Sequence, residues 1–165
     1  MRIKQLLFED FVNYRKPSMF IGAISCGGKC WVEQGLPCTT CQNNSLKNAT
    51  TEVVSNDTLI KWYLNNRITK AIVFGGLEPF EQFDEMYDFI DRLRHYYHCL
   101  DSVVIYTGYN PDEISGQLIQ LKRLGNIIVK FGRYVPGQEK HWDEILGVEL
   151  ASPNQFAVEL DKFEI

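Results

Sequence analysis

The sequence predicts an α/β fold in which helices cover a parallel sheet. Short, continuously apolar segments recur along the chain, and amphipathic segments of helical period separate them. Strands that are apolar on both faces are typical of parallel sheets packed beneath helices. A chain of 165 residues holds about five βα units at most, too few to close an eight-fold barrel. We therefore expect an open, partial parallel β/α barrel.

The first half of the chain predicts a strand, a long loop and a helix. Residues 17–25 are expected to form the first core strand. Residues 26–51 are rich in glycine, asparagine, threonine and cysteine and have no regular period. We expect them to form a long loop after that strand, and loops of such length are normally functional. Ser55 to Asp57 then offer an N-cap for a helix that ends near Asn65.

Strands and helices continue to alternate in the second half. We expect strands at residues 71–74, 102–106 and 126–131, helices at residues 80–97 and 111–124, and a short final strand at residues 145–150. Apolar residues at helical spacing predict both helices. Pro111 fits the first turn of the second helix, where its missing N–H costs no hydrogen bond.

Several unusual segments follow the carboxyl ends of the expected strands. They are the cysteine-rich loop, Gly75 with Gly76, Thr107 with Gly108, and Gly132. In a parallel α/β sheet the carboxyl ends of the strands lie together at one edge, where ligands bind. Segments that are far apart in the sequence are therefore expected to converge on one site.

The composition fits a single globular domain over residues 1–165. Hydrophobic residues make up 45% of the chain and charged residues 23%, and the formal net charge is −4. This charge offers no basic surface for nucleic acid. No run of about 18 apolar residues is available to span a membrane. The N-terminus has too short an apolar core for a secretory signal, so we expect a cytoplasmic protein with reduced cysteines.

Four cysteines lie within sixteen residues, at Cys26, Cys30, Cys38 and Cys41. Thiolates gathered so closely usually bind a soft metal or an iron–sulfur cluster. A glycine pair between the first two lets the backbone fold tightly, and Cys38-x2-Cys41 could form half of a zinc site. Four cysteine ligands would suit structural zinc, whereas three would leave one iron of a [4Fe–4S] cluster open to a small molecule. Spacing alone leaves both alternatives open.

The segment Gly75–Pro79 allows two interpretations. Paired glycines after a strand let a ligand approach the backbone, because no side chain blocks it. Glu78 could then accept a hydrogen bond from the ammonium group of a ligand. Alternatively, the glycines form a tight βα turn in which Glu78 and Pro79 start the next helix.

Two later segments have the same ambiguity. Tyr106 to Tyr109 could place a glycine gap between aromatic side chains that hold an adenine, or could simply end a core strand. Ser152 to Gln155 offer amide and hydroxyl groups, although a plain turn is the default for such a sequence. Each segment is weak evidence by itself, and the expected common location strengthens the set.

In combination, these motifs resemble the radical S-adenosylmethionine (SAM) superfamily. The similar segments, in the order of that family, are Phe20–Cys30, Cys41–Asn43, Gly75–Pro79, Tyr106–Tyr109, and Gly132–Tyr134 followed by Leu150–Gln155. Within the superfamily, the chain is most similar to the activating proteins of anaerobic ribonucleoside-triphosphate reductases, or to a closely related four-iron–four-sulfur domain.

This family carries its cluster on a Cys-x3-Cys-x2-Cys loop. Cys26 and Cys30 match its first two cysteines, and Cys41 matches the third because the Gln-Asn pair after it resembles the residues that usually follow there. Ten residues then separate the second and third cysteines, where the family normally has two. Cys38 is then either a spare thiol or a competing third ligand.

The resemblance implies a [4Fe–4S] cluster bound by Cys26, Cys30 and Cys41, with SAM on the fourth iron. It implies that an electron from a flavodoxin-like protein cleaves SAM to methionine and a 5′-deoxyadenosyl radical. That radical would generate a glycyl radical on a separate, large anaerobic reductase. No catalytic residue beyond the cluster ligands is implied. The residues expected to bind SAM are Gly75, Gly76, Glu78, Pro79, Tyr106 and Gly108.

Two other functions remain open at the level of the sequence. The same radical chemistry could act on a different target, such as a small molecule or a peptide. Alternatively, the chain could be a zinc or iron–sulfur binding module without catalysis.

Overall fold

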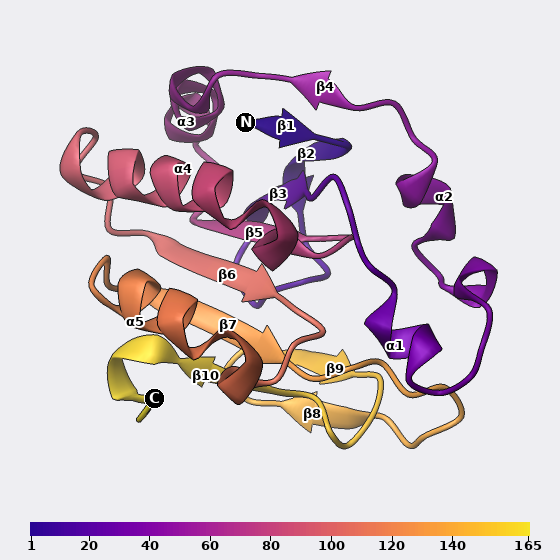
Figure 1. The fold of residues 1–165 in the computed structure, drawn as a ribbon. Helices are drawn as coiled ribbons and strands as arrows, with labels where there is room; N and C mark the ends of the chain where they lie inside the picture. Colours follow the sequence, from indigo (N-terminus) through magenta and orange to yellow (C-terminus); the bar gives the residue numbers. More distant parts are fainter.

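The structure is a computed structural model that describes the backbone of residues 1–165 and every side chain except that of Thr40. Its centre is a six-stranded mixed sheet (Figure 1). In spatial order its strands are β10 (Phe156–Glu159), β7 (Ile127–Phe131), β6 (Ser102–Tyr106), β5 (Ala71–Gly75), β3 (Ser18–Gly22) and β2 (Gln5–Asp10). The four inner strands are parallel, while β2 and β10 pair antiparallel at the two edges.

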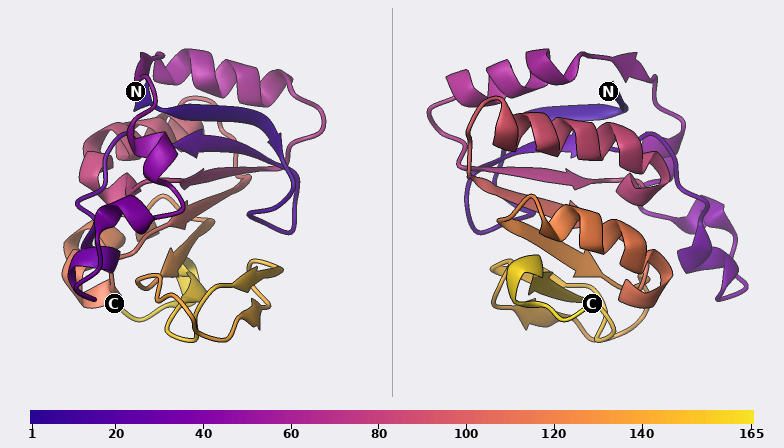
Figure 2. Two further views of the ribbon diagram at one scale, coloured as in Figure 1. Left: turned by 90° about the vertical axis from the view of Figure 1, so that its right-hand side faces the viewer. Right: turned by 60° about the vertical axis from the view of Figure 1, so that its left-hand side comes forward.

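Helices cover one face of this sheet (Figure 2). They are α3 (Asn56–Asn65), α4 (Phe83–His95) and α5 (Ser115–Lys122), and the 3₁₀ turns η2 (Pro79–Gln82) and η3 (Pro111–Ile114) precede the last two. Their buried apolar residues form one core with alternate strand residues, such as Ile72 and Phe74 of β5. The residue between these two, Val73, faces a second core that is built from loops and the C-terminal strands.

The remaining elements are short. They are β1 (Arg2–Ile3), which pairs with β4 (Glu52–Val53), the hairpin of β8 (His141–Asp143) and β9 (Val148–Leu150), the helical turns α1 (Lys29–Val32), η1 (Cys38–Thr40) and α2 (Asn44–Lys47), and the final turn η4 (Leu160–Lys162). The predicted long loop, residues 26–51, thus contains three short helical turns, and it lies beside the carboxyl ends of the inner strands (Figure 1). Within the described residues, no helix combines the length and hydropathy needed to cross a membrane.

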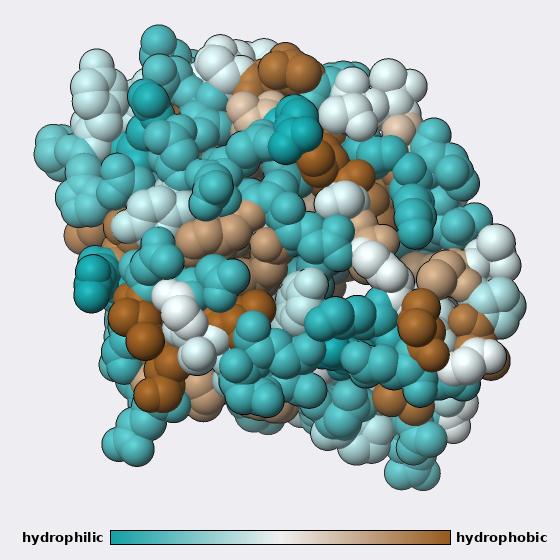
Figure 3. All heavy atoms as spheres, in the orientation of Figure 1, coloured by the Kyte–Doolittle hydropathy of each residue, from teal (hydrophilic) through white to brown (hydrophobic). Residues whose placement is uncertain are grey.

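Local sequence signals account for the main helices. As predicted, Ser55 caps α3, because its side chain accepts a hydrogen bond from the backbone N–H of Thr58 at 3.0 Å. Met86, Phe89 and Leu93 recur at helical spacing and bury the inner side of α4. The outer surface over these helices is mostly hydrophilic, with scattered apolar residues (Figure 3).

The structure confirms the α/β class and the parallel order of four inner strands. A partial barrel of about five βα units is not confirmed, because three helix-containing connections join these strands in the described chain and an antiparallel strand closes each edge. The sequence patterns missed the edge strands. Three consecutive residues of β2 are exposed, so this strand lacks a buried pattern. The expected strand at residues 145–150 shortens to β9, since Asp143 accepts the N–H groups of Ile145 and Leu146 in a turn.

The junction between β7 and the C-terminal segment depends on Gly132. Its φ is +95°, and a Cβ atom at this position would lie 2.4 Å from the backbone oxygen of Asn154. The side chain of Asn154 also donates a hydrogen bond to the carbonyl oxygen of Arg133 at 2.8 Å. Glycine therefore allows the C-terminal segment to pack directly on the end of β7.

Replacing Gly132 with alanine is expected to lower the free energy of unfolding by about 3 kcal/mol, because the methyl group meets rigid backbone and the positive φ is unfavourable. Gly125→Ala is the matched control. Gly125 has a φ of +70°, but no described atom beyond its chain neighbours lies within 4 Å of the added methyl group. The control should lose about 1 kcal/mol. Equal losses in urea denaturation would contradict the steric explanation.

Candidate metal centre

A cavity of about 470 Å³ lies at the carboxyl ends of the inner strands, on the sheet face that the helices leave uncovered. Phe20 of β3, Tyr106 of β6 and Lys130 of β7 line it from the sheet. The cysteine-rich segment contributes a second part of the lining, and the segment that ends at Gln155 contributes a third. The expected convergence of distant segments at one edge of the sheet is therefore confirmed.

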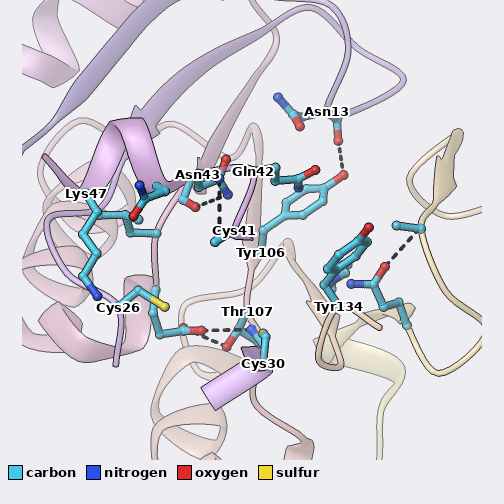
Figure 4. A pocket seen from close by; sticks show the side chains of 18 of the residues that line it. Asn13, Cys26, Cys30, Cys41, Gln42, Asn43, Lys47, Tyr106, Thr107 and Tyr134 are labelled. Carbon is cyan, nitrogen blue, oxygen red and sulfur yellow. Dashed lines mark hydrogen bonds between the residues drawn. The ribbon is translucent and has the colours of Figure 1, made fainter. Parts of the chain in front are cut away.

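All four clustered cysteines, Cys26, Cys30, Cys38 and Cys41, line this cavity. Each is partly exposed, and none forms a disulfide. Figure 4 labels Cys26, Cys30 and Cys41, and Cys26 and Cys30 lie apart in the pocket. Among the described residues, no three cysteine, histidine or carboxylate side chains are close enough together to hold one metal ion.

This donor set fits an iron–sulfur cluster. A single zinc ion would need all of its sulfur ligands about 2.3 Å from one point. A [4Fe–4S] cluster instead binds each thiolate to a different iron, so its ligands surround a larger object. Four thiols that line one cavity supply the kind of donor set that a [4Fe–4S] cluster requires.

The turn between Cys26 and Cys30 is organised around Gly28. This glycine precedes α1 with a φ of +73°, and its N–H donates to the sulfur of Cys26 at 3.4 Å. The sulfur of Cys38 packs against the same residue, because a Cβ atom on Gly28 would lie 2.6 Å from it. A side chain at this position would push Cys38 away from the turn.

Cys41 is connected to the end of β5 through Asn43. The backbone N–H of Asn43 donates to the sulfur of Cys41 at 3.4 Å. The side-chain amide of Asn43 donates to the carbonyl oxygen of Gly76 at 2.5 Å. The Cys-Gln-Asn and Gly-Gly motifs thus touch each other, and this contact fixes Cys41 relative to the sheet.

Glu78 ties the ends of β5 and β6 together. Its buried carboxylate accepts hydrogen bonds from the backbone N–H of Phe80 at 3.1 Å, the hydroxyl of Thr107 at 2.8 Å and the N–H of Gly108 at 2.9 Å. Burial raises the pKa of Glu78 to about 7, although these hydrogen bonds act in the opposite direction. The side chain also lines the cavity, so a role in the turn and a role toward a ligand are both compatible with its position.

Three other predicted SAM-binding residues belong to the same turn. Gly76 lines the cavity, whereas Gly75 and Pro79 lie outside its lining as the described side chains define it. A Cβ atom on Gly75 would meet the ring of Phe20 at 3.3 Å, and Pro79 is buried at the start of η2. The structure therefore gives Gly75 and Pro79 packing roles, and their contact with a ligand stays a prediction.

Tyr106 and Gly108 both line the cavity, as the predicted adenine site requires. The hydroxyl of Tyr106 donates to the carbonyl oxygen of Asn13 at 2.6 Å, which anchors the ring (Figure 4). Burial raises the pKa of this phenol above its usual value. At Gly108, a Cβ atom would lie 3.1 Å from the sulfur of Cys30, so the glycine leaves room for that cysteine.

Lys130 is a cavity residue that the sequence patterns did not reveal. It is 7% exposed, and its ammonium group donates to the carbonyl oxygen of Gly132 at 3.1 Å. Burial lowers the pKa of Lys130 to about 8, while the nearby Cys30 and Glu78 act to raise it. The available signal was a lysine inside an otherwise apolar strand, which is an expensive place for a charge.

Arg133 holds the cysteine-rich segment against the strand ends. Its buried guanidinium group donates to both oxygens of Glu33 at 2.8 and 3.0 Å, to Glu113, and to the carbonyl oxygen of Gly108 at 2.6 Å. Hydrogen bonds from Arg133 hold the pKa of Glu113 down at about 2. Because Glu33 directly follows α1, this network fixes the helical turn that carries Cys30.

The Arg133→Met variant is expected to release α1, because both glutamates lose their shared partner. Amide hydrogen exchange of residues 29–36 should accelerate about tenfold, and the free energy of unfolding should fall by about 2 kcal/mol. Arg92→Met is the control, since Arg92 forms exposed pairs with Asp57 and Asp88. It should cost at most about 1 kcal/mol and leave this exchange unchanged. Unchanged exchange in the Arg133 variant would show that α1 is held by other contacts.

The raised pKa of Glu78 predicts that the stability of the metal-free protein depends on pH. Its folded pKa of about 7 lies above the ordinary value of 4.5, so the folded state binds more protons between these pH values. Rising pH therefore removes stability across this window. Glu78→Gln should reduce the loss between pH 5 and pH 8 by about 3 kcal/mol relative to wild type. Denaturation at both pH values would measure it, and the exposed-site control Glu139→Gln should follow wild type. If the Glu78 variant lost as much stability between pH 5 and pH 8 as wild type, Glu78 would not be the group responsible.

Comparison with known proteins agrees with this chemistry. A family model described as a 4Fe-4S single cluster domain matches residues 29–149. The matched stretch includes Cys30, Cys38 and Cys41 and begins after Cys26. Nothing matched among curated proteins or among solved structures. The family model covers well over half of the chain, and the chain therefore belongs to the family of 4Fe-4S single cluster domains.

Proposed function

We propose that this protein is a radical SAM enzyme that activates an anaerobic ribonucleoside-triphosphate reductase by generating a glycyl radical on it. In this proposal Cys26, Cys30 and Cys41 bind three irons of the [4Fe–4S] cluster, and the fourth iron binds SAM. One observation carries the proposal: thiols, a buried carboxylate and a buried amine from separate segments line a single open cavity. A cluster that binds a ligand needs such a cavity, whereas a closed structural metal site does not.

The charged groups of the cavity complement the amino-acid end of SAM. Among the described residues, Oε2 of Glu78 accepts one hydrogen bond, from Gly108, which leaves it able to accept another from an N–H of the amino group of SAM. Lys130 donates one hydrogen bond, to Gly132, and has further N–H groups for a carboxylate. Both side chains are buried, which strengthens their attraction for opposite charges. The pair therefore supports a zwitterionic ligand.

Aromatic side chains offer surfaces for the nucleoside end of the same ligand. Tyr106 and Tyr134 both line the cavity, and Figure 4 shows their rings in the pocket. The ring of Tyr134 also packs against Trp31 of α1, with a centroid distance of 5.5 Å. Because flat aromatic faces stack with purine rings, these two tyrosines support binding of an adenine.

The residues of this chain position the reactants and leave the reaction itself to the cofactors. When bound, the cluster would supply the electron that cleaves the sulfonium bond of SAM. The protein would hold SAM by its charged groups, keep it beside the thiols and exclude water. We assign no catalytic role to any residue beyond the cluster ligands.

Exposed apolar residues beside the cavity support a protein as the recipient of the radical. Leu7 and Val12 line the cavity, and Val12 is 73% exposed. The adjacent Phe11 is 63% exposed. Grouped apolar residues on a surface are typical of sites where another protein docks. They would receive the glycine-bearing loop of the large reductase, and a flavodoxin-like protein would donate the electron.

A second candidate is an iron–sulfur module without catalysis. The matching family is described by a cluster, which is all that this candidate requires. A radical SAM enzyme with a small molecule or a peptide as its target is a variant of the first candidate, and the cavity residues support both equally.

Anaerobic reconstitution followed by reduction with dithionite in the presence of SAM tests the function. The wild-type protein should form a brown cluster and release 5′-deoxyadenosine and methionine. Cys26→Ala, Cys30→Ala and Cys41→Ala should each form less cluster and lose SAM cleavage, because each variant lacks one of the three permanent thiolate ligands. Cys99→Ala is the control, since Cys99 lies outside the lining of the cavity and should leave both unchanged.

The rival candidates give different results in the same assay. A brown protein that bleaches with dithionite but never cleaves SAM would support the non-catalytic module, and a colourless protein with stoichiometric zinc would overturn the cluster. If SAM is cleaved, an anaerobic pull-down that captures a large glycyl-radical reductase would support the activase. SAM cleavage without such capture would favour another target.

A further inference from the structure

Cys38 has a position that packing does not explain. It is partly exposed and lines the same cavity as the other three clustered thiols. Its thiol donates a long hydrogen bond to the carbonyl oxygen of Gly28 at 4.0 Å, and the residue belongs to neither of the two hydrophobic cores. Cys99, by comparison, is partly buried against the larger core. Cys38 therefore lies at the cavity without filling a hydrophobic core.

Two contacts place Cys38 among the ligands. The sulfur of Cys38 packs against Gly28. The backbone N–H of Gly28 donates to the sulfur of Cys26, so both sulfurs contact the same residue. Cys38 also begins η1, and its carbonyl oxygen accepts the N–H of Cys41 at 3.1 Å. Cys38 thus links the turn of the first two cysteines to the third. The stretch matched by the 4Fe-4S family includes Cys38 as well.

The surroundings of Cys38 allow it to move. Residues 35–37 and Thr39 are exposed, and among the described side chains none caps η1. Two of the other proposed ligands are attached more firmly, since Asn43 connects Cys41 to the end of β5 and Arg133 holds the segment of Cys30. A ligand on a surface turn can leave the metal without disturbing the core.

We propose that Cys38 binds the fourth iron of the cluster while SAM is absent and is displaced when SAM binds. The displacement rests on the proposed function, whereas the ligation does not. In the exchange, one iron–thiolate bond breaks and the amine and carboxylate of SAM bind that iron instead. The ammonium group loses one proton on binding, and the released thiolate takes up one proton. No electron moves, and the total charge is unchanged.

Oxidation of the SAM-free protein tests the ligation. An iron without a thiolate ligand is readily lost from a [4Fe–4S] cluster on mild oxidation, which leaves a three-iron cluster with its own EPR signal. With ferricyanide, the wild type should keep four irons, and Cys38→Ala should keep its colour but convert to the three-iron form. Cys99→Ala is the control and should behave as wild type. Equal three-iron signals in wild type and Cys38→Ala would refute ligation by Cys38.

The same experiment shows whether Cys38 is a fourth ligand of the cluster or one of only three ligands. If Cys38 is one of three permanent ligands, Cys38→Ala will fail to hold any cluster, and Cys41→Ala will hold one. That outcome would overturn both the proposed exchange and the assignment of Cys41.

Alkylation and affinity test the displacement. In the holo protein, iodoacetamide should leave Cys38 unmodified without SAM and should modify it after SAM is added, as located by peptide mass spectrometry. Cys26, Cys30 and Cys41 should stay protected in both states. Cys38→Ala should bind SAM about tenfold more tightly than wild type, if the thiolate occupies the iron in about nine molecules of ten. Labelling of Cys38 that is independent of SAM, together with equal affinities, would refute the displacement.

Two combined outcomes of these experiments distinguish the role of Cys38 from the reaction with SAM. If wild type and Cys38→Ala both cleave SAM but lose iron equally, the enzyme assignment stands and Cys38 is a spare thiol. If neither cleaves SAM and Cys38→Ala alone forms the three-iron cluster, Cys38 is a permanent fourth ligand, and both the displacement and the radical SAM assignment are wrong.

Discussion

The parallel pairing of β3, β5, β6 and β7 is the constraint on which the candidate site depends. It places the carboxyl ends of all four strands on the same side of the sheet, where segments far apart in sequence meet. The helices cover one face only, so a cavity can form on the other face at that edge. If one of these strands were reversed, its end would lie at the opposite edge, and the cavity would lose a side.

Polar contacts, more than apolar packing, hold the cysteine-rich segment at this edge. Trp31 is the only buried apolar side chain described between residues 26 and 51. The segment is attached by the ion pair of Glu33 with Arg133 and by the hydrogen bond of Asn43 with Gly76. Such contacts fix direction and distance without filling a core. They leave the thiols exposed to the cavity. Thiols packed in an apolar core would be inaccessible to a metal.

The buried charges show how one set of residues can serve both the fold and the chemistry. Glu78 joins two strand ends through three hydrogen bonds, yet its carboxylate also borders the cavity. Lys130 donates to the carbonyl oxygen of Gly132 just after its own strand, and its side chain lines the same cavity. Burying charged groups is costly, and the folded chain offsets part of this cost with its own hydrogen bonds. A zwitterionic ligand would offset more of it, which makes binding and local stability interdependent.

The sequence by itself determined the inner strands, the N-cap at Ser55 and the cysteine cluster. The apolar run at residues 102–106 and the N-cap at Ser55 act over a few neighbours, so local patterns predict them. Only the tertiary structure decided that β2 and β10 close the edges, that Lys130 faces the thiols, and that Arg133 pairs with Glu33. Each of these depends on which segments become neighbours in space. Hydrophobic periodicity and local propensity do not predict which segments become neighbours, because this depends on how the whole chain buries its apolar surface.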